Sequence, residues 1–526
     1  MSKRQPRALM VQGTGSNVGK SILTTALCRI FLEDGFRVAP FKAQNMALNA
    51  YATRDGLEMS RAQALQAAAC RLDPDVRMNP ILIKPTTERQ SQLVVMGKAM
   101  PLMTWSEYNE LKPTLRPVVQ EAYRSLAEGV DLIVLEGAGS PAEINLMAHD
   151  IVNMAAAEMA DASVLLVGDI DAGGVFASLV GTVALLPPHQ AARIKGFVLN
   201  KFRGDRAILA PGLDQIRAIT GRPVVGVVPY LERLLLPEED SVDFKSGRMP
   251  RFKKKGAAEV LCRIAVIDLP KVSNFTDLDP FCVEPDVEMM ILRPGEALEK
   301  EGRPPDVVIL PGSKNVAEDL HLLRQHHFDR ALREFVSGGG EVVGLCGGLQ
   351  MLGERIEDPH QIEGNRTPVL GLGLLPIRTV LEREKVLRLV AARHLISGLE
   401  LRGYEIHHGR TEAAACHPSF VQISGGIGRS TPRGPMQLGW MNETGHVWGT
   451  YLHGLFDDDP FRRWFIDRVR ERKGLPPLKE IQATYDIEAM IQRLAEVVRK
   501  ELDMPAVYDL LGMVGGGNGN HRMAGL

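Results

Sequence analysis

The sequence predicts an α/β protein in which two mostly parallel sheets, one in each half of the chain, are covered by helices. Short apolar runs rich in β-branched residues alternate with helix-like segments in both halves. Strands buried on both faces have such continuous apolar runs, and their alternation with helices is typical of parallel sheets. A glycine-rich loop after the first run and a glycine-flanked cysteine after a later one indicate a functional site in each half. The predicted strands span residues 8–12, 37–41, 131–136, 163–169, 196–200 and 224–228, then 263–269, 287–292, 306–310 and 341–345.

The domain organisation follows from length and local composition. At 526 residues the chain is too long for one ordinary core, so we expect two or three domains. The two α/β series predict a first domain over residues 1–240 and a second over 261–475. Basic, glycine- and proline-bearing sequence predicts an exposed linker over 241–260. Residues 476–526 predict a C-terminal helical segment and a flexible tail, because the final glycine-rich stretch has few apolar side chains to offset its ordering entropy.

The overall composition excludes several classes of function. A formal net charge of -2 gives no electrostatic basis for binding nucleic acid or an anionic membrane. No apolar stretch approaches the roughly 18–20 residues needed to span a bilayer. The basic amino terminus runs directly into the first predicted strand, which leaves no room for a cleavable signal. We therefore expect a cytoplasmic protein with small-molecule partners, no nucleic acid and no membrane insertion; the sequence leaves the oligomeric state open.

A phosphate-binding loop is predicted where GTGSNVGKS joins the first strand to the helix-like segment SILTTALCRIFLEDG. In such a loop, backbone N–H groups and a helix amino terminus surround the phosphates. Lys20 would reach the outer phosphates of ATP, and the Ser21 hydroxyl would bind Mg²⁺. Five residues instead of the usual four separate Gly13 from Gly19, a spacing that resembles the dethiobiotin-synthetase-like branch of the P-loop fold, GT-x-x-x-VGK-[ST]. The predicted ATP contacts in the loop are Gly13, Thr14, Gly15, Ser16, Asn17, Val18, Gly19, Lys20 and Ser21.

Three polar residues at strand ends are further candidates for this nucleotide site. Glu136 ends the run DLIVLE, at the carboxyl edge of a predicted parallel strand where ligands collect. The resemblance implies that it binds Mg²⁺ in its E-G-A-G context; the alternative is a cap of the strand end. Asn200, in GFVLNKFRGD, matches an asparagine that reads the adenine edge in that branch, or is a simple turn residue. Asp169, in GDIDAGG, either binds Mg²⁺ or substrate, or terminates its strand.

Cys346 is the one cysteine of six whose neighbourhood indicates chemistry. The six are scattered without a C-x-x-C pair, which argues against a zinc knuckle, and a reducing compartment argues against disulfides. The sequence GLCGG after a predicted strand is typical of a nucleophile elbow, where a following helix lowers the thiol pKa. A base must accept the thiol proton. His453, at the end of the strand GHVWGTYLHGLF, is the first candidate, and His407 and His408 in GYEIHHGR are the second.

The motifs LPGSKN, GLCGGLQMLG and GTYLHGLF together resemble a class I glutamine amidotransferase domain. Such a domain hydrolyses glutamine through a cysteinyl thioester and releases ammonia. Backbone amides of Gly347 and of the loop at Gly312 and Ser313 would hold the oxyanion. The resemblance places Gln350 near the glutamine pocket. Leu455 stands two positions after the predicted base, where the usual domain has an acidic residue, so we expect a Cys–His dyad with weaker intrinsic glutaminase activity.

Long sequence blocks in both halves resemble the cobyric acid synthase family. They are PFKAQNMALN, EGAGSPAEINL, DIVNMAAAEMADA, GDIDAGGVFAS and GYEIHHGRT, which occur in order along the chain. The resemblance extends over nearly the whole chain, excluding the linker and the tail. The resemblance implies that ATP phosphorylates carboxylates on a corrin rim and that ammonia from L-glutamine displaces the phosphate. It implies adenosylcobyrinic acid a,c-diamide as the acceptor and its b, d, e and g carboxylates as the positions amidated. Phosphorylation supplies the leaving group that a carboxylate lacks, and Lys20 with Mg²⁺ would neutralise the transferring charge.

Recognition of the corrin is harder to predict from residue types. Gln44, Asn45 and Asn49 in QNMALN, and Asn145 in the EINL block, carry amides suited to a rim of amides and carboxylates. The alternative is that each of them caps or turns the backbone. Two other functions also stay open: a glutamine-dependent amidotransferase acting on a different polycarboxylate such as a cell-wall glutamate, and a P-loop ATPase scaffold with an inactive glutaminase-like domain.

Overall fold

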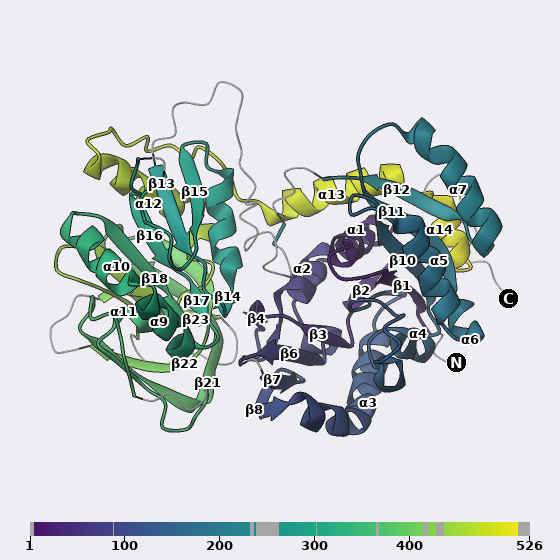
Figure 1. Ribbon diagram of the computed structural model, residues 1–526, viewed down its shortest axis with the longest axis horizontal. Helices are drawn as coiled ribbons and strands as arrows, with labels where there is room; N and C mark the ends of the chain where they lie inside the picture. The colour runs from purple at the N-terminus through teal and green to yellow at the C-terminus, as the bar shows by residue number, and fades with distance from the viewer. Residues whose placement is uncertain are drawn as a thin grey trace.

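The computed structural model describes residues 5–87, 89–231, 236–237, 262–300, 302–363, 368–413, 419–427 and 436–513. Two α/β bodies lie beside one another, and the last helices of the chain return from the second body to the first (Figure 1). The predicted linker and the glycine-rich tail lie outside the described residues. The predicted fold class, a P-loop-type parallel-sheet domain followed by an amidotransferase-like α/β domain, is confirmed.

The first body is built on a six-stranded parallel sheet in the order β12-β11-β10-β1-β9-β2. Successive side chains of β1 enter two separate apolar cores, Met10 on one face and Leu9 and Val11 on the other. Helices must therefore cover both faces, as the unbroken apolar runs of the strands predict. The strands are β1 (Arg7–Gly13), β2 (Val38–Phe41), β9 (Leu132–Glu136), β10 (Ser163–Asp169), β11 (Ile194–Phe202) and β12 (Val224–Pro229).

One face of this sheet carries a helix from the start of the chain and two helices from its end. Side chains of the last two helices, among them Leu494 and Val507, share a core with Leu27 of the first helix. The sequence predicts helical structure here but not this return. Arg29 and Glu488 join the two ends of the chain through an ion pair of 2.7 Å. The helices on this face are α1 (Lys20–Glu33), α13 (Ile487–Glu501) and α14 (Met504–Leu510), and the remaining helices of the body are α2 (Arg61–Ala69), η1 (Val76–Met78), α3 (Trp105–Ala127), η2 (Met147–His149), α4 (Met154–Met159), α5 (Val175–Leu185), α6 (Pro188–Ala191) and α7 (Arg206–Thr220).

Short strands inserted between β2 and α3 extend the first body toward the second (Figure 1). They form a four-stranded sheet in the order β3-β6-β7-β8 and a separate antiparallel pair, β4 with β5. Helix α2 follows β5 directly, and the Ser60 hydroxyl caps it by accepting from the backbone N–H of Ala62. The strands are β3 (Gln44–Met46), β4 (Ala50–Ala52), β5 (Glu58–Ser60), β6 (Ile81–Pro85), β7 (Gln90–Val95) and β8 (Lys98–Thr104).

The second body contains an eleven-stranded mixed sheet. Its first five strands, in the order β15-β13-β16-β18-β25, are parallel, and antiparallel strands continue it through β24 and β23 to the long pair β21–β22. A two-stranded pair, β14 with β17, lies beside it. The strands are β13 (Cys262–Ile267), β14 (Val272–Ser273), β15 (Val287–Leu292), β16 (Val307–Leu310), β17 (Gly312–Ser313), β18 (Glu341–Leu345), β19 (Arg355–Glu357), β20 (Val369–Leu370), β21 (Ile377–His394), β22 (Glu400–Ala413), β23 (Ser419–Ile427), β24 (Gln437–Met441) and β25 (Val447–Thr450).

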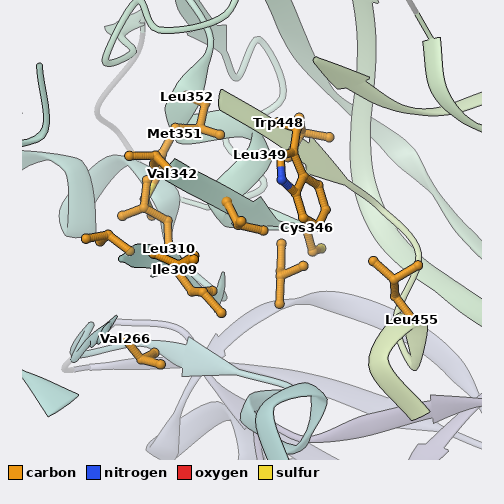
Figure 2. Packing of buried hydrophobic residues seen from close by; sticks show 14 of the residues in the cluster. Val266, Ile309, Leu310, Val342, Cys346, Leu349, Met351, Leu352, Trp448 and Leu455 are labelled. Carbon is orange, nitrogen blue, oxygen red and sulfur yellow. The ribbon is translucent and has the colours of Figure 1, made fainter. Parts of the chain in front are cut away.

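The core of the second body surrounds the strand that ends at the predicted nucleophile (Figure 2). Val342 of β18, Ile309 of β16 and Trp448 of β25 are fully buried in it. Leu455 belongs to the same core and is 1% exposed, so an acidic side chain there would be buried among apolar groups. The helices of this body are η3 (Phe275–Val283), α9 (Val316–Gln325), α10 (Phe328–Ser337), α11 (Gly347–Leu352), η4 (Leu455–Asp457) and α12 (Asp459–Arg472).

The two bodies meet at a mixed apolar and ionic interface. Ala50 and Leu82 of the first share an apolar cluster with Tyr404 and Ile406 of the second. Beside it, Glu58 on β5 accepts from Lys385 on the β21 side at 2.6 Å, and both side chains are buried. The contact therefore combines apolar area with buried ion pairing instead of resting on a solvated surface.

No helix in the described part of the chain is long and apolar enough to cross a membrane. The described cysteines are all free, and Cys28, Cys70, Cys262 and Cys282 are buried. Cys416 lies outside the described residues.

Candidate active sites

The predicted phosphate loop lies between β1 and α1 and curls around the end of its lysine. Gly19 has φ of 98°, a left-handed backbone that favours glycine. Lys20 Nζ donates to Gly15 O at 2.7 Å and to Gly139 O at 3.2 Å. The ammonium is thus held at the mouth of the loop, beside the amino terminus of α1, where a phosphate would be attracted by both.

Glu136 and Ser21 lie together at the carboxyl edge of the first sheet. Glu136 ends β9, is 1% exposed and accepts on Oε1 from Ser21 Oγ and from Lys42 Nζ, each at 2.8 Å. Its Oε2 accepts from Gln66 Nε2 of α2 at 2.5 Å. A hydroxyl beside a carboxylate is a donor set that a hard divalent cation takes, so these two residues fit a Mg²⁺ ion.

A cavity of about 740 Å³ opens in front of the phosphate loop. The loop and Glu143 line one part of it, and Met46, Trp105 and Lys112 line another. Lys112 Nζ lies 4.9 Å from the centroid of the Trp105 ring, which is 46% exposed. The cavity is in the range of sites that enclose a sizeable ligand, and it offers a cation, carboxylates, amides and an aromatic face together.

Asn200 and Asp169, both predicted for the nucleotide site, make contacts of their own. Asn200 Nδ2 donates to Val18 O at 2.8 Å, and a Cβ added to Gly19 would meet this nitrogen at 2.0 Å. Asn200 therefore packs against the phosphate loop and lines the cavity. Asp169 ends β10 and is itself outside the cavity lining, although its ion-pair partner at 2.8 Å, Lys201, lines the cavity. Its Oδ1 accepts from the backbone N–H of Asp171 at 2.9 Å, a contact that agrees with the strand-terminating alternative.

Two of the four amides predicted to contact substrate line the cavity. Gln44 and Asn45 extend from β3 at its wall. Asn45 is buried, and its Nδ2 donates to Ser60 Oγ at 2.8 Å and to Gln63 Oε1 at 2.9 Å. Gln44 accepts from the hydroxyl of Tyr108. The Gln44 side chain is the more accessible of the two for a ligand.

The other two predicted amides lie elsewhere. Asn49 is fully buried outside the residues that line the cavity, directly before β4 and the interface between the bodies. Asn145 is exposed between Glu143 and Leu146, which both line the cavity, but is itself outside the lining. Sequence proximity within a block thus does not distinguish residues that line the cavity from residues that do not.

Cys346 occupies a strained turn between β18 and α11. Its φ of 50° and ψ of -104° are unusual for a residue with a side chain. A Cβ on Gly344 would meet Gly348 C at 2.7 Å, and one on Gly348 would meet Leu310 O at 2.0 Å. Glycine on both sides is therefore required for the helix to pack on the strand end. The Cys346 thiol approaches Ile406 O at 3.7 Å and lies within hydrogen-bond reach of the His453 imidazole.

The imidazole of His453 is oriented by a carboxylate that the sequence analysis missed. Its Nδ1 lies 2.7 Å from Asp277 Oδ2, and Asp277 Oδ1 accepts from the backbone N–H of Gly454 at 2.9 Å. The imidazole and the carboxylate are 1% and 4% exposed. The prediction of a dyad, made because Leu455 replaces the usual acid, is wrong in its geometry: an acid is present, but it comes from η3, 176 residues earlier in the chain.

The surroundings of His453 favour its protonated form. Burial disfavours the imidazolium and lowers the pKa, but the charge and hydrogen bond of Asp277, and then the contact with Cys346, outweigh burial. Together they raise the pKa from 6.5 to about 10. A neighbouring carboxylate that holds the imidazolium is the role the third member plays in catalytic triads.

The alternative histidines have other partners. His407 Nε2 lies 3.1 Å from Glu405 Oε2, and its Nδ1 lies 2.8 Å from Gly409 O. His408 Nδ1 donates to Glu382 O at 3.0 Å, and burial is the main cause that lowers its pKa to about 3. His407 thus contacts protein groups through both ring nitrogens, and His408 does so through Nδ1. His453 is the histidine beside Cys346.

The predicted oxyanion amides lie close together. A Cβ on Gly347 would meet Ser313 N at 2.7 Å, so the start of α11 packs against β17. Gly312 approaches Ser273 O of β14 closely enough that a Cβ would lie 2.6 Å from it. Ser313 Oγ donates to the buried carboxylate of Asp319 at 2.6 Å, which holds this loop in place.

Gln350, predicted for the glutamine pocket, is buried one turn after the nucleophile. Its Nε2 lies 3.2 Å from the Tyr451 hydroxyl, and a Cβ on Gly409 would meet it at 2.3 Å. It therefore packs between Gly409 of β22 and Tyr451, the residue after β25. Its direct contacts are with protein groups.

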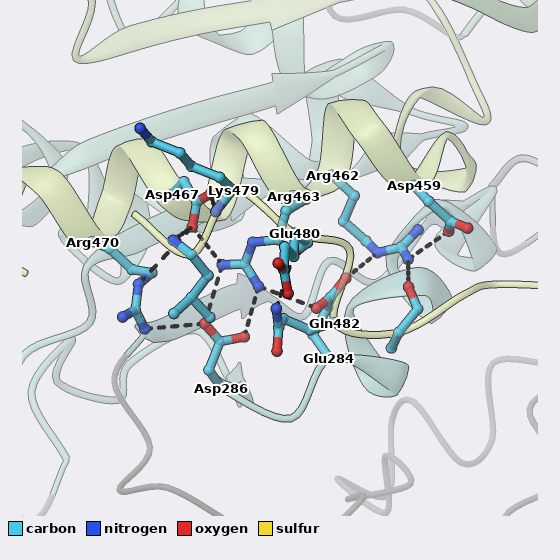
Figure 3. A network of polar contacts seen from close by, with 12 residues as sticks. Glu284, Asp286, Asp459, Arg462, Arg463, Asp467, Arg470, Lys479, Glu480 and Gln482 are labelled. Atoms are coloured by element: carbon cyan, nitrogen blue, oxygen red, sulfur yellow. Dashed lines mark hydrogen bonds and ion pairs between the residues drawn. The ribbon is translucent and has the colours of Figure 1, made fainter. Parts of the chain in front are cut away.

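A buried ionic network fixes the element that carries Asp277 (Figure 3). Arg462 of α12 donates to Glu284 Oε1 at 2.7 Å, just after η3, and to Phe456 O at 2.9 Å, just after the His453 turn. Arg463 reaches Asp286 at 3.0 Å. One helix thus anchors both segments that bring the carboxylate and the imidazole together.

Comparison with known proteins identifies the family. Residues 9–242 match the model of the CobQ/CobB/MinD/ParA nucleotide binding domain, and residues 263–461 match that of the CobB/CobQ-like glutamine amidotransferase domain. The chain is 48% identical to cobyric acid synthase of Nitratidesulfovibrio vulgaris, covering 96% of this chain and 97% of that protein. Cobyric acid synthases of Clostridium botulinum and Photorhabdus laumondii are each 46% identical, covering 96% of this chain and 99% and 98% of theirs. The chain belongs to the cobyric acid synthase family.

As a cobyric acid synthase family member, the chain is a glutamine-hydrolysing amide ligase of cobalamin biosynthesis that uses ATP. This membership decides against the ATPase scaffold and against an acceptor from cell-wall synthesis. One residue at the ATP site that the sequence could have indicated is Lys42. It directly follows a predicted strand in the PFKAQN block. Asp277 had no such signal, because nothing local in NFTDLDPF connects it to the His453 turn.

Proposed function

We propose that this synthase amidates the b, d, e and g carboxylates of adenosylcobyrinic acid a,c-diamide, using ATP, Mg²⁺ and ammonia derived from glutamine. The observation that carries the proposal is the cavity of about 740 Å³, which joins the phosphate loop to a wall with amide, cationic and aromatic side chains. A corrin with several carboxylates needs such a mixed lining, since its ring is apolar and its rim is polar. The proposal places the reaction in the cytoplasm, where ATP and glutamine are supplied.

In the first half-reaction, a corrin carboxylate oxygen attacks the γ-phosphorus of ATP, the bond to the β-phosphate oxygen breaks, and ADP leaves. The product is an acyl phosphate. Lys20 at the loop mouth stabilises the charge on the phosphates. Ser21 and Glu136 would hold Mg²⁺, which neutralises phosphate charge when bound. Lys42, on the same carboxylate oxygen, is placed to contact either the nucleotide or the acceptor.

In the second site, the Cys346 sulfur attacks the side-chain carbonyl of glutamine after His453 accepts the thiol proton. The amides at Gly347 and Ser313 would stabilise the oxyanion. His453 then gives its proton to the departing nitrogen, which leaves as ammonia, and water hydrolyses the thioester to glutamate. Asp277 holds the imidazole through both proton transfers.

Ammonia then attacks the acyl phosphate carbon, phosphate leaves, and a primary amide remains. Each amidation consumes one ATP and one glutamine, so each corrinoid requires four molecules of ATP and four of glutamine. The apolar cluster shared by the two bodies lies between the site of ammonia release and the insertion that carries Gln44 and Asn45. Ammonia is uncharged and crosses apolar surroundings more readily than ammonium does.

The decisive experiment supplies the protein with ATP, Mg²⁺, glutamine and adenosylcobyrinic acid a,c-diamide. Mass spectrometry should record four successive exchanges of an acid hydroxyl for an amide, with one glutamate released per exchange. A corrinoid of unchanged mass, together with ATP-dependent amidation of a different polycarboxylate, would overturn the proposed acceptor. Amidation that stops before four exchanges would overturn the assignment of the four positions.

A further inference from the structure

Asn274 connects the glutaminase base to the other body of the molecule. It is the residue before η3, is 4% exposed and has a left-handed backbone with φ of 51°. Its Oδ1 accepts from the backbone N–H of Ala50 at 2.9 Å, and Ala50 begins β4 in the first body. Its Nδ2 lies 3.3 Å from Nε2 of His453. One amide thus contacts both the interface strand and the imidazole.

The backbone of Ala50 determines which way round this amide faces. A backbone N–H can only donate, so the oxygen of Asn274 must face Ala50 and its nitrogen must face His453. An amide N–H satisfies Nε2 only when that nitrogen carries a lone pair. The proton of the neutral imidazole is then on Nδ1, where Asp277 accepts it at 2.7 Å.

This contact opposes the reactive state of the thiol. The lone pair on Nε2 is the one that must accept the proton of Cys346, and in the resulting imidazolium the Asn274 N–H would face another N–H. We propose that Asn274 is a positioning residue that opposes protonation of His453 at Nε2, and so acts against Asp277, while β4 is docked; this restraint ends when β4 moves. The inference rests on the proposed glutaminase role of Cys346 and His453.

A connected set of contacts leads from β4 to the ATP site. Strand β4 pairs with β5, α2 follows β5 directly, and Gln66 of α2 donates to Glu136 at 2.5 Å. Gln63 of the same helix lies 3.5 Å from that carboxylate. Binding of Mg²⁺ and ATP at Glu136 would replace the contacts of Gln63 and Gln66 with this carboxylate. The resulting displacement of α2 would move the β4–β5 pair, and with it the backbone N–H that Asn274 contacts at the glutaminase site.

The charge balance at the imidazole includes groups from every neighbouring element. Asp277 from η3 and Cys346 from the elbow contact it, and the Tyr404 ring of β22 stacks on it at 5.1 Å. Arg61 of α2 donates to the Tyr404 hydroxyl at 3.2 Å and pairs with Asp457 of η4 at 3.7 Å. These groups are unchanged by a substitution at Asn274, so a change in titration would report the group that stands in place of the amide.

Two substitutions separate the contacts of Asn274. Asn274→Gly retains the left-handed backbone and removes the whole amide. Asn274→Asp still accepts from Ala50 but presents a carboxylate to His453 in place of a donor. Thr276→Val is the matched control in η3, because the Thr276 hydroxyl is buried without a hydrogen-bond partner among the described residues. Folding of each variant is checked by circular dichroism. If Asn274→Gly does not fold, the result for Asn274→Asp decides the test.

The first readout is alkylation of Cys346 by iodoacetamide against pH, followed at its own peptide by mass spectrometry. Both Asn274 variants should shift the alkylation midpoint to lower pH, by roughly half to one unit, because the thiolate–imidazolium pair forms more easily without the opposing donor. The Thr276 variant should follow the wild type. An unchanged midpoint in Asn274→Asp, or an equal shift in Thr276→Val, would overturn the proposal.

The second readout is glutamate release with and without ATP and the corrinoid. The wild type should be stimulated by them, whereas Asn274→Gly should release glutamate about fivefold faster without them, the factor that one hydrogen bond between uncharged groups provides. ATP and the corrinoid should then raise the rate of glutamate release by Asn274→Gly little or not at all. A slower or equal basal rate with full stimulation contradicts the restraint. Absence of glutamate release from the wild type under every condition would instead refute the proposed function, while the alkylation profile still tests Asn274.

Discussion

Replacing Asp277 by asparagine tests the third member of the glutaminase site directly. The carboxylate accepts from two donors, His453 Nδ1 and the backbone N–H of Gly454, at 2.7 and 2.9 Å. An amide of the same shape has only one oxygen, and the backbone N–H can only donate. The amide nitrogen therefore faces Nδ1, which forces the imidazole proton onto Nε2 and removes the lone pair that must accept the proton of Cys346.

The expected loss is large because the pair is buried. The environment raises the pKa of His453 from 6.5 to about 10, which at 1.36 kcal/mol per unit corresponds to ~5 kcal/mol in favour of the imidazolium, with Asp277 as the first cause that raises it. Losing much of this preference together with the correct tautomer should lower kcat for glutamate release by about 10²–10⁴. Amidation supplied with ammonium chloride should change by less than about twofold, since the ATP site is untouched.

The pH dependence of glutaminase activity should also shift in a defined direction in Asp277→Asn. The imidazolium is needed to protonate the departing ammonia and is lost as pH rises through its pKa, which is about 10 in the native protein. With a neutral partner, that pKa falls, so the alkaline limb of glutaminase activity should move to lower pH. The assay is glutamate release between pH 6 and the alkaline limit of stability, with ammonium-dependent amidation as the internal reference.

Asp279 provides the matched control two residues further along η3. Burial raises the pKa of its carboxyl well above the usual value, which favours the neutral form, and an uncharged asparagine has the same shape. Asp279→Asn should therefore retain the glutaminase rate of the wild type. If Asp277→Asn also remained within about threefold of the wild type, the orienting role would be refuted, and the dyad that Leu455 suggests would be the better description.

The remaining predictions concern both sites and the framework between them. Cys346→Ala should abolish glutamine-dependent amidation and leave ammonium-dependent amidation intact, measured as amide product with each nitrogen source. Lys20→Ala should stop both modes, since phosphate activation is lost; turnover with ammonium would contradict an ATP-activated acceptor. Arg462→Met should lower the free energy of unfolding by about 3–5 kcal/mol in urea titrations, because the buried carboxylate of Glu284 loses its closest cation. Trp105→Ala should raise KM for the corrinoid about tenfold, consistent with loss of an aromatic contact, without changing glutaminase activity; an unchanged KM would remove this ring from the substrate site.

Backbone-determined features were predictable because glycine reports them locally. The left-handed Gly19 and the close approach of Gly344 and Gly348 across the elbow both follow from sterics within a few residues. The sequence pattern therefore located the phosphate loop and the turn at Cys346. The same is true of the strand ending at Glu136, whose apolar run defines both its burial and the edge at which its carboxylate appears.

Features that depend on long-range packing were not predictable in this way. The last helices have an amphipathic pattern, but nothing in it indicates that Val498 packs against the first body instead of the second. Asn49 follows Asn45 by four residues in one polar block, yet Asn45 lines the cavity and Asn49 is buried outside that lining. Local residue type predicted that these amides would be engaged, and only the three-dimensional arrangement separates their partners.

The origin of the third acid explains why the glutaminase depends on the rest of the molecule. An acid two residues after His453 would belong to the same turn and would orient the imidazole whatever the neighbouring domain did. Here Leu455 fills the core at that position, and the carboxylate comes from η3, whose preceding residue, Asn274, contacts the first body. Both ring nitrogens of His453 are thus contacted by one short segment, through Asp277 and Asn274, and Asn274 of this segment also contacts the first body. A substitution that displaces η3 should consequently change basal glutamine hydrolysis and its coupling to ATP together. A substitution confined to the phosphate loop should stop amidation and the stimulation of glutamine hydrolysis by ATP, and leave basal glutamate release unchanged.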